Sequence, residues 1–405
     1  MTAQPDLLLR GERRREVRHD VVVVGAGLAG SGIAAALAQR GWDVLLVERD
    51  RFPRHKVCGE FLSPEAQHSL ETLGLLDEVV ALGPVPLHAA AITTPGGTTI
   101  EMALPADAWG LSRYALDARL AGAVERRGGQ VWQGATVAST VCEGDGYVVH
   151  VRCRGAARHQ EDRILRARAI LMACGRHSNP ALPPRTMART ADKRGWRDCI
   201  GLKIHYRNVR MEPRVELYLF PGGYVGINPV EGGRANVCLL ITANAFQAAG
   251  KSLACVLDMV ADRHPLFAER LRDADAVAES ECAVAPVDTQ RRPAPWDAET
   301  GAACIGDTAA MIPPLAGDGM AMALRSAELC LEPAHAFLQG TLSLDGWAAE
   351  YSRAWQGEFG RRLRLGQALQ SVLTSRGLGD AMAAVGQRLP WAANWLLAAT
   401  RGRIA

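Results

Sequence analysis

The hydrophobic pattern at the start of the chain predicts a strand–helix–strand unit. A β-branched run, Asp20–Val24, is typical of a buried parallel strand. It continues into a glycine-rich turn and an Ala- and Leu-rich stretch that predicts a helix as far as Arg40. Gly41 ends that helix, and a second apolar run over 44–47 predicts the next strand, which ends at Glu48. The folded chain is therefore expected to begin with a βαβ unit.

Two later stretches have strand patterns of another kind. The first, 86–104, consists of short strand-like pieces with Pro95–Gly97 as a turn. The second, 185–287, shows the alternation of an antiparallel sheet with one solvated or ligand-facing side. In the second stretch, apolar side chains occupy alternate positions: Ile200, Leu202, Ile204, Tyr206, Val215, Leu217 and Leu219. These stretches predict a domain different in kind from the first unit.

Short apolar runs at 169–173 and 302–305 predict two more buried strands, and 116–127 predicts a helix. The fold class is therefore α/β, with a split Rossmann-like domain, an inserted antiparallel β-sheet domain and a helical C-terminal tail. The expected boundaries are as follows: 1–19 for a basic N-terminal tail, 20–85, 105–180 and 296–335 for the Rossmann-like domain, 86–104 and 181–295 for a substrate-binding sheet domain, and 336–405 for the C-terminal helical region.

Composition narrows the class of protein. With 48% hydrophobic and 22% charged residues among 405, the chain is typical of a soluble globular enzyme. A net charge of +3 gives no case for nucleic acid as a partner. No apolar run reaches the roughly 18 residues of a membrane span. The ten cysteines include no C-x-x-C pair and no zinc-type spacing, so no metal site is predicted, and a cytoplasmic location is expected.

The turn after the first strand has the spacing Gly25-x-Gly27-x-x-Gly30. Glycines there permit a tight turn and close approach of a pyrophosphate to the N-terminus of the following helix. Glu48 ends the second strand, where its carboxylate can accept hydrogen bonds from an adenosine ribose. An accidental glycine-rich turn would not combine a preceding strand, a following helix and this acidic residue, so a dinucleotide site is predicted.

A second signature late in the chain points to FAD rather than NAD. Asp307 follows the predicted strand 302–305, in position to bind a hydroxyl of the ribityl chain. Gly317, Gly319 and Met320 then begin a helix whose N-terminal dipole would stabilise negative charge on a reduced flavin. An early Rossmann fingerprint paired with this late signature resembles the FAD-binding group that includes para-hydroxybenzoate hydroxylase, over about residues 20 to 335.

A finer resemblance is to the geranylgeranyl reductase-like branch of that group. Phe52–Glu60, continuing to Pro64, resembles the F-P-R-x-K-x-C-G-x-x-L-S-P stretch of the branch. Arg113 resembles the arginine that begins a helix and approaches the FAD, and Pro221–Pro229 with Arg234–Val237 resembles the Y-x-W-x-F-P segment and its following strand.

This sequence departs from the branch at three positions. Gly226 and Asn228 stand where the branch has tryptophan and phenylalanine, so the predicted substrate wall is reshaped. Cys174 replaces an acidic residue of the middle signature, Ala173–Ser178, which usually has the pattern G-A-D-G-x-x-S.

Together the motifs and the resemblance predict these FAD-binding residues: Gly25, Gly27, Leu28, Ala29, Gly30, Glu48, Arg49, Arg113, Asp307, Gly317, Gly319 and Met320. Cys58 and Tyr224 are the predicted catalytic residues, because their matched positions lie at the flavin or substrate in the branch. Cys58 could equally be a small buried apolar residue. Further candidates, for which a surface or structural role competes, are Lys56, Glu60, His55 and His205.

A single dinucleotide fingerprint means that NAD(P)H would dock transiently or that an external reductase would supply electrons. Reduced flavin can pass a hydride to an activated alkene or react with O₂ to form a C4a-hydroperoxide. We expect a monooxygenase that hydroxylates or epoxidises an aromatic, polyketide-like or lipid substrate. The alternative is a geranylgeranyl reductase-like ene reductase that saturates C=C bonds of a prenyl or polyene substrate. A halogenase is disfavoured because W-x-W-x-I-P is absent, and a non-enzymatic FAD-binding protein is a further alternative.

The C-terminal region combines arginines with tryptophans at positions 347, 355, 391 and 395. Basic, tryptophan-bearing helices can contact a membrane surface peripherally. The polar residues are mixed along the helices rather than segregated to one face, which favours helices that cap the substrate cavity and bury the tryptophans against the sheet domain. Membrane association is the alternative.

Overall fold

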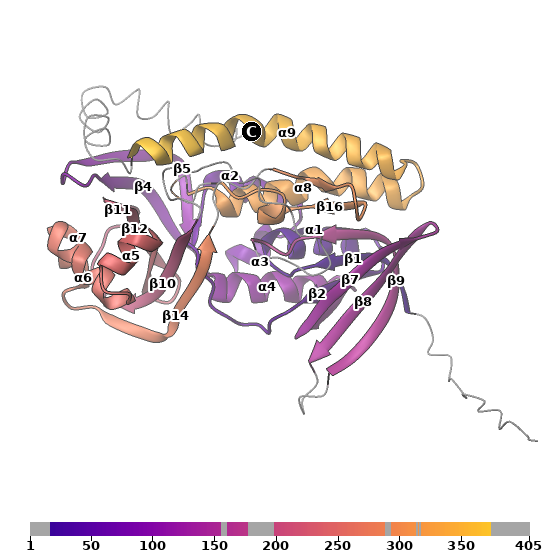
Figure 1. Cartoon of the computed structure of the whole chain (residues 1–405), viewed down its shortest axis with the longest axis horizontal. Helices are drawn as coiled ribbons and strands as arrows, with labels where there is room; N and C mark the ends of the chain where they lie inside the picture. The colour runs from indigo at the N-terminus through magenta and orange to yellow at the C-terminus, as the bar shows by residue number, and fades with distance from the viewer. Residues whose placement is uncertain are drawn as a thin grey trace, which may run out of the picture.

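The computed structural model describes residues 17–154, 160–176, 198–287, 293–312, 315 and 317–373. Two sheets lie side by side, and a long C-terminal helix runs along the molecule (Figure 1). The predicted α/β fold with a Rossmann-like domain and a second sheet is confirmed. The basic segment 1–16 lies outside the described residues.

The first sheet is built on parallel strands in the order β16–β9–β1–β2–β6. Their bounds are β16 Ala302–Cys304, β9 Gln160–Met172, β1 Val17–Val24, β2 Val44–Glu48 and β6 Gln130–Gln133. Both faces of the central strands are covered, which is why 21–24 and 44–47 are continuous apolar runs. At the edges, β15 Trp296–Asp297 pairs with β16, and the hairpin β7 Ala135–Glu143 and β8 Gly146–Arg154 extends from β9.

Helix α1 Leu28–Gln39 follows β1 and is buried along almost its whole length. Its Ala and Gly residues let the neighbouring elements approach closely, and its large apolar side chains, Leu28, Ile33 and Leu37, are buried between them. Helix α4 Arg113–Arg126 packs beside α1 through Leu116, Leu120 and Val124, the apolar face that the sequence predicts. The short helices α2 Pro64–Thr72 and α3 Leu76–Val80 complete this layer.

The second sheet has the order β14–β10–β13–β12–β11–β4–β5–β3. These strands are β14 Asp275–Val287, β10 Cys199–Arg207, β13 Arg234–Thr242, β12 Gly223–Val230, β11 Arg214–Phe220, β4 Val85–Thr93, β5 Thr99–Gly110 and β3 Phe61–Leu62. The sheet is largely antiparallel, as predicted, but β11 and β4 pair in parallel. The expected boundary at 104 falls inside β5, because that strand continues in this sheet as far as Gly110.

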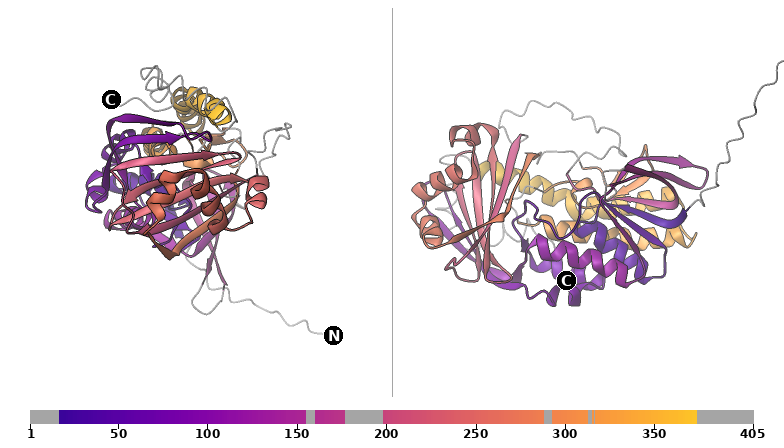
Figure 2. Two further views of the ribbon diagram at one scale, coloured as in Figure 1. Left: turned by 90° about the vertical axis from the view of Figure 1, so that its left-hand side faces the viewer. Right: turned by 90° about the horizontal axis from the view of Figure 1, so that it is seen from below.

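The two faces of the second sheet have different neighbours. Leu202, Ile204 and Ile227 point toward helices α5 Ala243–Ala248, α6 Leu253–Arg263 and α7 Pro265–Leu271, which cover the outer face. Figure 2 shows these helices on the side of the sheet away from the first domain. The other face, with Lys203 and His205 on β10, faces the first domain.

The chain returns to the first sheet through β15 and β16, then forms the short 3-10 helix η1 Gly306–Thr308. Helix α8 Gly319–Leu338 packs on α1, and α9 Leu344–Leu373 packs along α8. Trp347 and Trp355 are buried in the core of the first domain, not against the sheet domain as the sequence predicted. They lie there because the apolar face of α9 covers α8, where Trp347 meets Trp296 and Phe337.

The segment 374–405 lies outside the described residues, and with it Trp391, Trp395 and the predicted membrane contact. Within the part of the chain that the structure describes, no helix is both long enough and apolar enough to cross a bilayer.

The buried face of α9 is expected to contribute strongly to stability. Trp355 is 1% exposed and packs against Phe359. Trp355→Ala should lower the free energy of unfolding by about 3–5 kcal/mol because it removes a large buried ring. Arg353→Ala, at an exposed position on the same helix, is the control and should change it by less than about 0.5 kcal/mol. Urea unfolding followed by far-ultraviolet circular dichroism measures both, and equal midpoints for the two variants would contradict the prediction.

Candidate functional site

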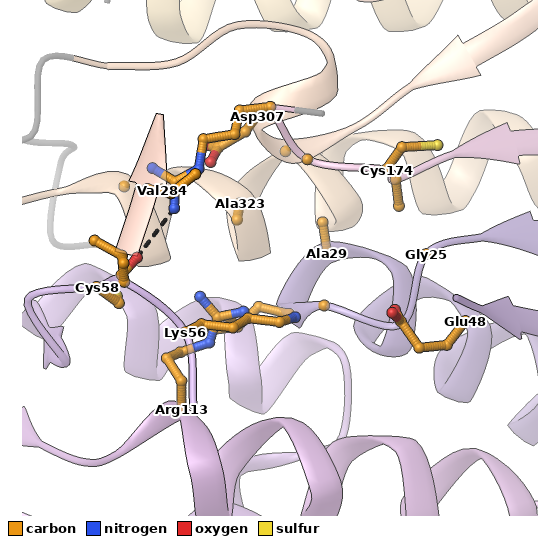
Figure 3. Close-up of a pocket in the computed structure, with 18 of the residues that line it drawn as sticks. Gly25, Ala29, Glu48, Lys56, Cys58, Arg113, Cys174, Val284, Asp307 and Ala323 are labelled. Atoms are coloured by element: carbon orange, nitrogen blue, oxygen red, sulfur yellow. Dashed lines mark hydrogen bonds between the residues drawn. The ribbon is translucent and has the colours of Figure 1, made fainter. Parts of the chain in front are cut away.

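A cavity of about 1160 Å³ opens at the carboxyl ends of β1, β2 and β9. Figure 3 shows Glu48 at one end and Cys58 at the other, with Lys56 and Arg113 facing Asp307 across it. All of the predicted cofactor-binding residues except Gly30 line it: Gly25, Gly27, Leu28, Ala29, Glu48, Arg49, Arg113, Asp307, Gly317, Gly319 and Met320. Residues from opposite ends of the sequence therefore meet around one space.

The three glycines of the turn are required for different structural reasons. Gly25 has φ +104°, and a Cβ there would lie 2.4 Å from the carbonyl oxygen of Ala173. Gly30 lies behind the turn, where a Cβ would lie 1.8 Å from the carbonyl oxygen of Gly25. At Gly27 a Cβ would be 3.7 Å from the nearest atom, the Nη2 of Arg113, so it would project into open cavity space. Gly25 and Gly30 thus let the backbone pack closely, whereas Gly27 keeps room for a ligand.

Glu48 is buried at the end of β2. Its carboxylate accepts hydrogen bonds from the backbone N–H of Ala26 at 2.8 Å and of Asp50 at 3.0 Å, and Arg54 donates to it at 3.2 Å. These contacts fix the carboxylate beside the glycine turn. Thr136 and Val137 of β7 and Arg152 of β8 also line this end of the cavity.

The opposite wall comes from η1 and the first turn of α8. Asp307 follows β16, and burial raises the pKa of its carboxyl group. Gly319 and Met320 begin α8, so the N-terminal end of the helix faces the cavity. That end carries partial positive charge and backbone N–H groups, which favour an anion or a group that becomes anionic.

Three charged side chains, Asp117, Arg113 and Lys56, lie together at the wall of the cavity nearer α4. The carboxylate of Asp117 is fully buried and accepts two hydrogen bonds from Arg113, at 2.7 and 2.9 Å, and it pairs with Lys56 at 2.6 Å. Burial alone would raise the pKa of Asp117, but the Arg113 and Lys56 cations lower it below its ordinary value. Burial also lowers the pKa of Lys56. The arrangement holds two cations at the cavity on one buried anion.

A smaller apolar pocket of about 150 Å³ adjoins the cavity. Tyr224, Gly226 and Asn228 line it from β12, and Val57, Cys58 and Phe61 line both spaces. Because Gly226 has no side chain, Leu217 packs close to its backbone: a Cβ at this position would lie 3.0 Å from Leu217. The two replacements noted in the sequence therefore shape this pocket. Burial raises the pKa of Tyr224 well above its ordinary value, so its hydroxyl keeps its proton.

Cys58 lies where the two spaces join. Its sulfur accepts a hydrogen bond from the backbone N–H of Glu60 at 3.4 Å and also interacts with the Arg113 side chain. Asn236 of β13 donates to its carbonyl oxygen at 3.1 Å. Arg176 donates to the carbonyl oxygen of Val57 at 3.1 Å and lines both spaces. The position of Cys58 is thus set from both domains.

Behind Cys58 lies a cluster of buried charges that joins the domains. The Glu60 carboxylate pairs with Lys203 and with His205, each at 2.6 Å, and Lys203 also approaches Nδ1 of His55 at 3.3 Å. Burial opposes ionisation of Glu60, but the hydrogen bond from His205 and the charge of Lys203 lower its pKa. Burial and the nearby Lys203 lower the pKa of His55 to about 4, so His55 is neutral at pH 7.

Sequence reasoning did not identify Asp117, Arg176 or Lys203 as site residues. Asp117 had a usable signal, because it follows Arg113 by one helical turn, the spacing of a side-chain ion pair. Arg176 lies in the middle signature that ends the buried strand β9. Lys203 alternates with Leu202 and Ile204 on a strand, a pattern that does not distinguish a buried cation from a solvated one.

The residues present fit an FAD molecule. The cavity is long, Gly27 leaves space for a pyrophosphate at the N-terminus of α1, and a buried carboxylate lies at the end that an adenosine ribose would occupy. At the other end, the N-terminus of α8 faces the space where a flavin ring would lie.

Comparison with known proteins agrees with this fit. A family model described as "FAD binding domain" matches residues 18–341. Digeranylgeranylglycerophospholipid reductase 2 of Methanopyrus kandleri is 30% identical over 356 residues, which cover 85% of this chain and 84% of that protein. Menaquinone reductase of Mycolicibacterium smegmatis is 26% identical over 383 residues, which cover 88% and 85%.

Among solved structures, a myxobacterial chondrochloren halogenase has a TM-score of 0.72 at 23% identity and covers 88% of this chain and 82% of its own. A flavin-dependent brominase has a TM-score of 0.77 at 16% identity, with 95% and 94% covered. At such identities these two structures show the shared fold alone. The family match and the reductases aligned along most of the chain confirm the resemblance seen in the motifs. The chain belongs to the FAD-binding domain family of FAD-dependent oxidoreductases, in its geranylgeranyl reductase-like branch.

Proposed function

We propose that this FAD-dependent oxidoreductase saturates a C=C bond in a hydrophobic, isoprenoid-like substrate. The observation that carries the proposal is the apolar pocket that opens onto the cofactor cavity at Cys58. The names of the two relatives, both reductases that align along most of this chain, support it. The proposal takes the alternative from the sequence analysis in preference to the monooxygenase.

Reduced FAD, when bound, supplies a hydride to one carbon of the alkene. The other carbon then needs a proton, and we assign its delivery to Cys58, whose thiol lies where the cavity and the pocket join. In this step the S–H bond breaks, a C–H bond forms and a thiolate remains. The backbone N–H of Glu60 and the Arg113 guanidinium, which contact Cys58, would stabilise that thiolate.

The pocket itself would position the alkene and exclude water. Its walls include Ile92, Met102, Leu217 and Leu240, so it offers an alkyl chain dispersion contacts and few polar groups. Tyr224 stays protonated in this pocket, so its hydroxyl can donate or accept a hydrogen bond there and its ring can pack against the chain. We therefore assign Tyr224 to substrate positioning.

The monooxygenase remains a second candidate because of Gly226 and Asn228. Without the two aromatic side chains of the branch, this wall is formed by Leu217 beside Gly226 and by the polar side chain of Asn228, so it can accept a substrate of different shape. Oxygenation would use the same dry pocket and needs no proton donor on the substrate carbon. In either case we propose NAD(P)H, or an external reductase, as the source of electrons.

The placement of the cofactor predicts the effect of a change at Gly27. Gly27→Leu should abolish FAD binding because its side chain would fill the space left for the pyrophosphate. Gly357→Leu, at an exposed glycine of α9 with open space around it, is the matched control and should keep its FAD. Flavin absorbance per mole of purified protein measures both, and full flavin content in Gly27→Leu would refute the placement.

The role of Cys58 predicts a loss of turnover without a loss of cofactor. Cys58→Ala should lower kcat by about a hundredfold or more, the usual contribution of a general acid, at unchanged FAD content. The control, Cys255→Ala, removes an exposed thiol on α6 and should leave kcat unchanged. Unaltered kcat in Cys58→Ala would make Cys58 a packing residue.

The reaction type is tested by supplying reduced protein with two classes of partner. Under nitrogen, dithionite-reduced protein should be reoxidised by menaquinone or by a geranylgeranyl lipid. Fragment mass spectrometry should find the two added hydrogens in the isoprenoid chain, which distinguishes saturation of a C=C bond from reduction of the quinone ring to the quinol. If reoxidation instead needs O₂ and the product has gained an oxygen atom, the monooxygenase is the correct assignment.

A further inference from the structure

Glu60 has a backbone conformation that its residue type disfavours. Its φ of +53° lies in the left-handed region, which favours glycine. Two other non-glycine residues in the described part of the chain share a positive φ, Asn208 and Lys251, and both are exposed. Glu60 is instead fully buried. A buried residue keeps such a conformation only when its surroundings hold it there.

The groups that hold Glu60 come from both domains. Its carboxylate binds Lys203 and His205 of β10, in the second sheet, and accepts the backbone N–H of Arg113 at the start of α4 at 2.9 Å. Its carbonyl oxygen accepts hydrogen bonds from the backbone N–H of Leu111 at 3.1 Å and from the side chain of Asn228 at 3.4 Å. Side chain and backbone are thus fixed independently.

The held conformation has one chemical consequence at the site. It directs the N–H of Glu60 back to the sulfur of Cys58. The charged and titratable groups around this sulfur are Arg113 on α4, Tyr224 on β12, Glu60 and Lys203 behind it, and Cys238 and Cys282 on the strands either side of Lys203. A rotation of the Glu60 backbone toward an ordinary φ would remove the N–H donor and leave Arg113 as the group that contacts the sulfur.

We propose that Glu60 is a positioning residue for Cys58: the Lys203–Glu60–His205 cluster of the sheet domain holds Glu60 in its left-handed conformation, and this conformation keeps its N–H on the thiol. The reactivity of Cys58 then depends on the contact between the two domains, because Lys203 and His205 bind Glu60 only when the substrate-binding sheet is packed against the FAD-binding domain. The inference rests on the proposed function, in which Cys58 donates the proton, but the reactivity of the thiol can be measured without substrate.

A purely structural role would predict a different result. If the cluster only joined the domains, its loss would lower stability and leave the chemistry of Cys58 alone. The chain offers a matched control in Glu216, a buried carboxylate on β11 of the second sheet that is bound by Arg214 and Arg270. Glu216 hydrogen-bonds to Tyr218, which packs on the outer face of the sheet, away from Cys58.

The test uses the FAD-loaded protein and its Glu60→Gln, Lys203→Met and Glu216→Gln variants. The rate of alkylation by iodoacetamide is measured at Cys58 by peptide mass spectrometry, with exposed Cys255 as the reference within each sample. Thermal midpoint and flavin content are measured alongside. Glu60→Gln should slow alkylation of Cys58 by about fivefold to tenfold, because the thiolate loses the hydrogen bond from the N–H of residue 60. Loss of the carboxylate charge alone would have the opposite effect and speed alkylation, so a slower rate identifies the positioning role. Lys203→Met should also lower the rate of alkylation of Cys58.

In Glu216→Gln the thermal midpoint should fall while the Cys58 rate stays within twofold of the wild type. An unchanged Cys58 rate in a folded, FAD-bound Glu60→Gln would overturn the proposal. If Glu60→Gln loses FAD, an unchanged rate in Lys203→Met overturns it equally. A slowed thiol in a protein that reduces no alkene would uphold the positioning role and reject the proposed reaction, so the two failures are distinguishable.

Discussion

The parallel pairing of β1 with β2 on one side and β9 on the other determines where the chemistry lies. Parallel strands end at the same edge of a sheet. The last residues of β1, β2 and β9, which are Val24, Glu48 and Met172, therefore lie close together although they are far apart in the sequence. The turn after β1 can follow this edge only because Gly25 and Gly30 lack side chains where their Cβ atoms would meet backbone. Strand β16 pairs with β9 in the same direction and brings Asp307 to the same edge.

The second sheet supplies the apolar surface that this edge of the first sheet lacks. The cofactor cavity has charged walls, with Arg113, Lys56 and Asp307, whereas the adjoining pocket is formed mainly by apolar side chains of the sheet. Cys58 lies at the boundary between these two environments, and the contacts that fix it come from both domains. A reaction between a charged cofactor and an apolar substrate requires such a boundary, since neither environment alone would bind both molecules.

The sequence predicted best those features that depend on a short stretch of chain. The glycine turn and Asp307 follow buried strands, and Glu48 ends one, so the local pattern was enough to place them at the cavity. The ion pairs of Glu60 could not be predicted, because Lys203 and His205 are distant in sequence and a strand pattern does not say which polar residue is buried. The burial of Trp347 was expected but against the wrong partner, since an apolar helix face does not specify what covers it. The parallel pair β11–β4 depends likewise on how distant strands meet.

The contact between Arg362 and Asp318 gives the C-terminal helix a part in the cofactor site. Asp318 is buried immediately before α8, next to the Gly319 and Met320 backbone that lines the cavity, and Arg362 of α9 pairs with it. A buried carboxylate without its cation is strongly unfavourable. A shortened protein that ended before Arg362 would lose this cation, and the hydrogen bond from Ser63 would not replace its charge. The negative charge of Asp318 would then be less well compensated beside the space where a flavin would lie. Because added negative charge disfavours reduction, removing the C-terminal part of α9 would lower the redox potential of the bound cofactor.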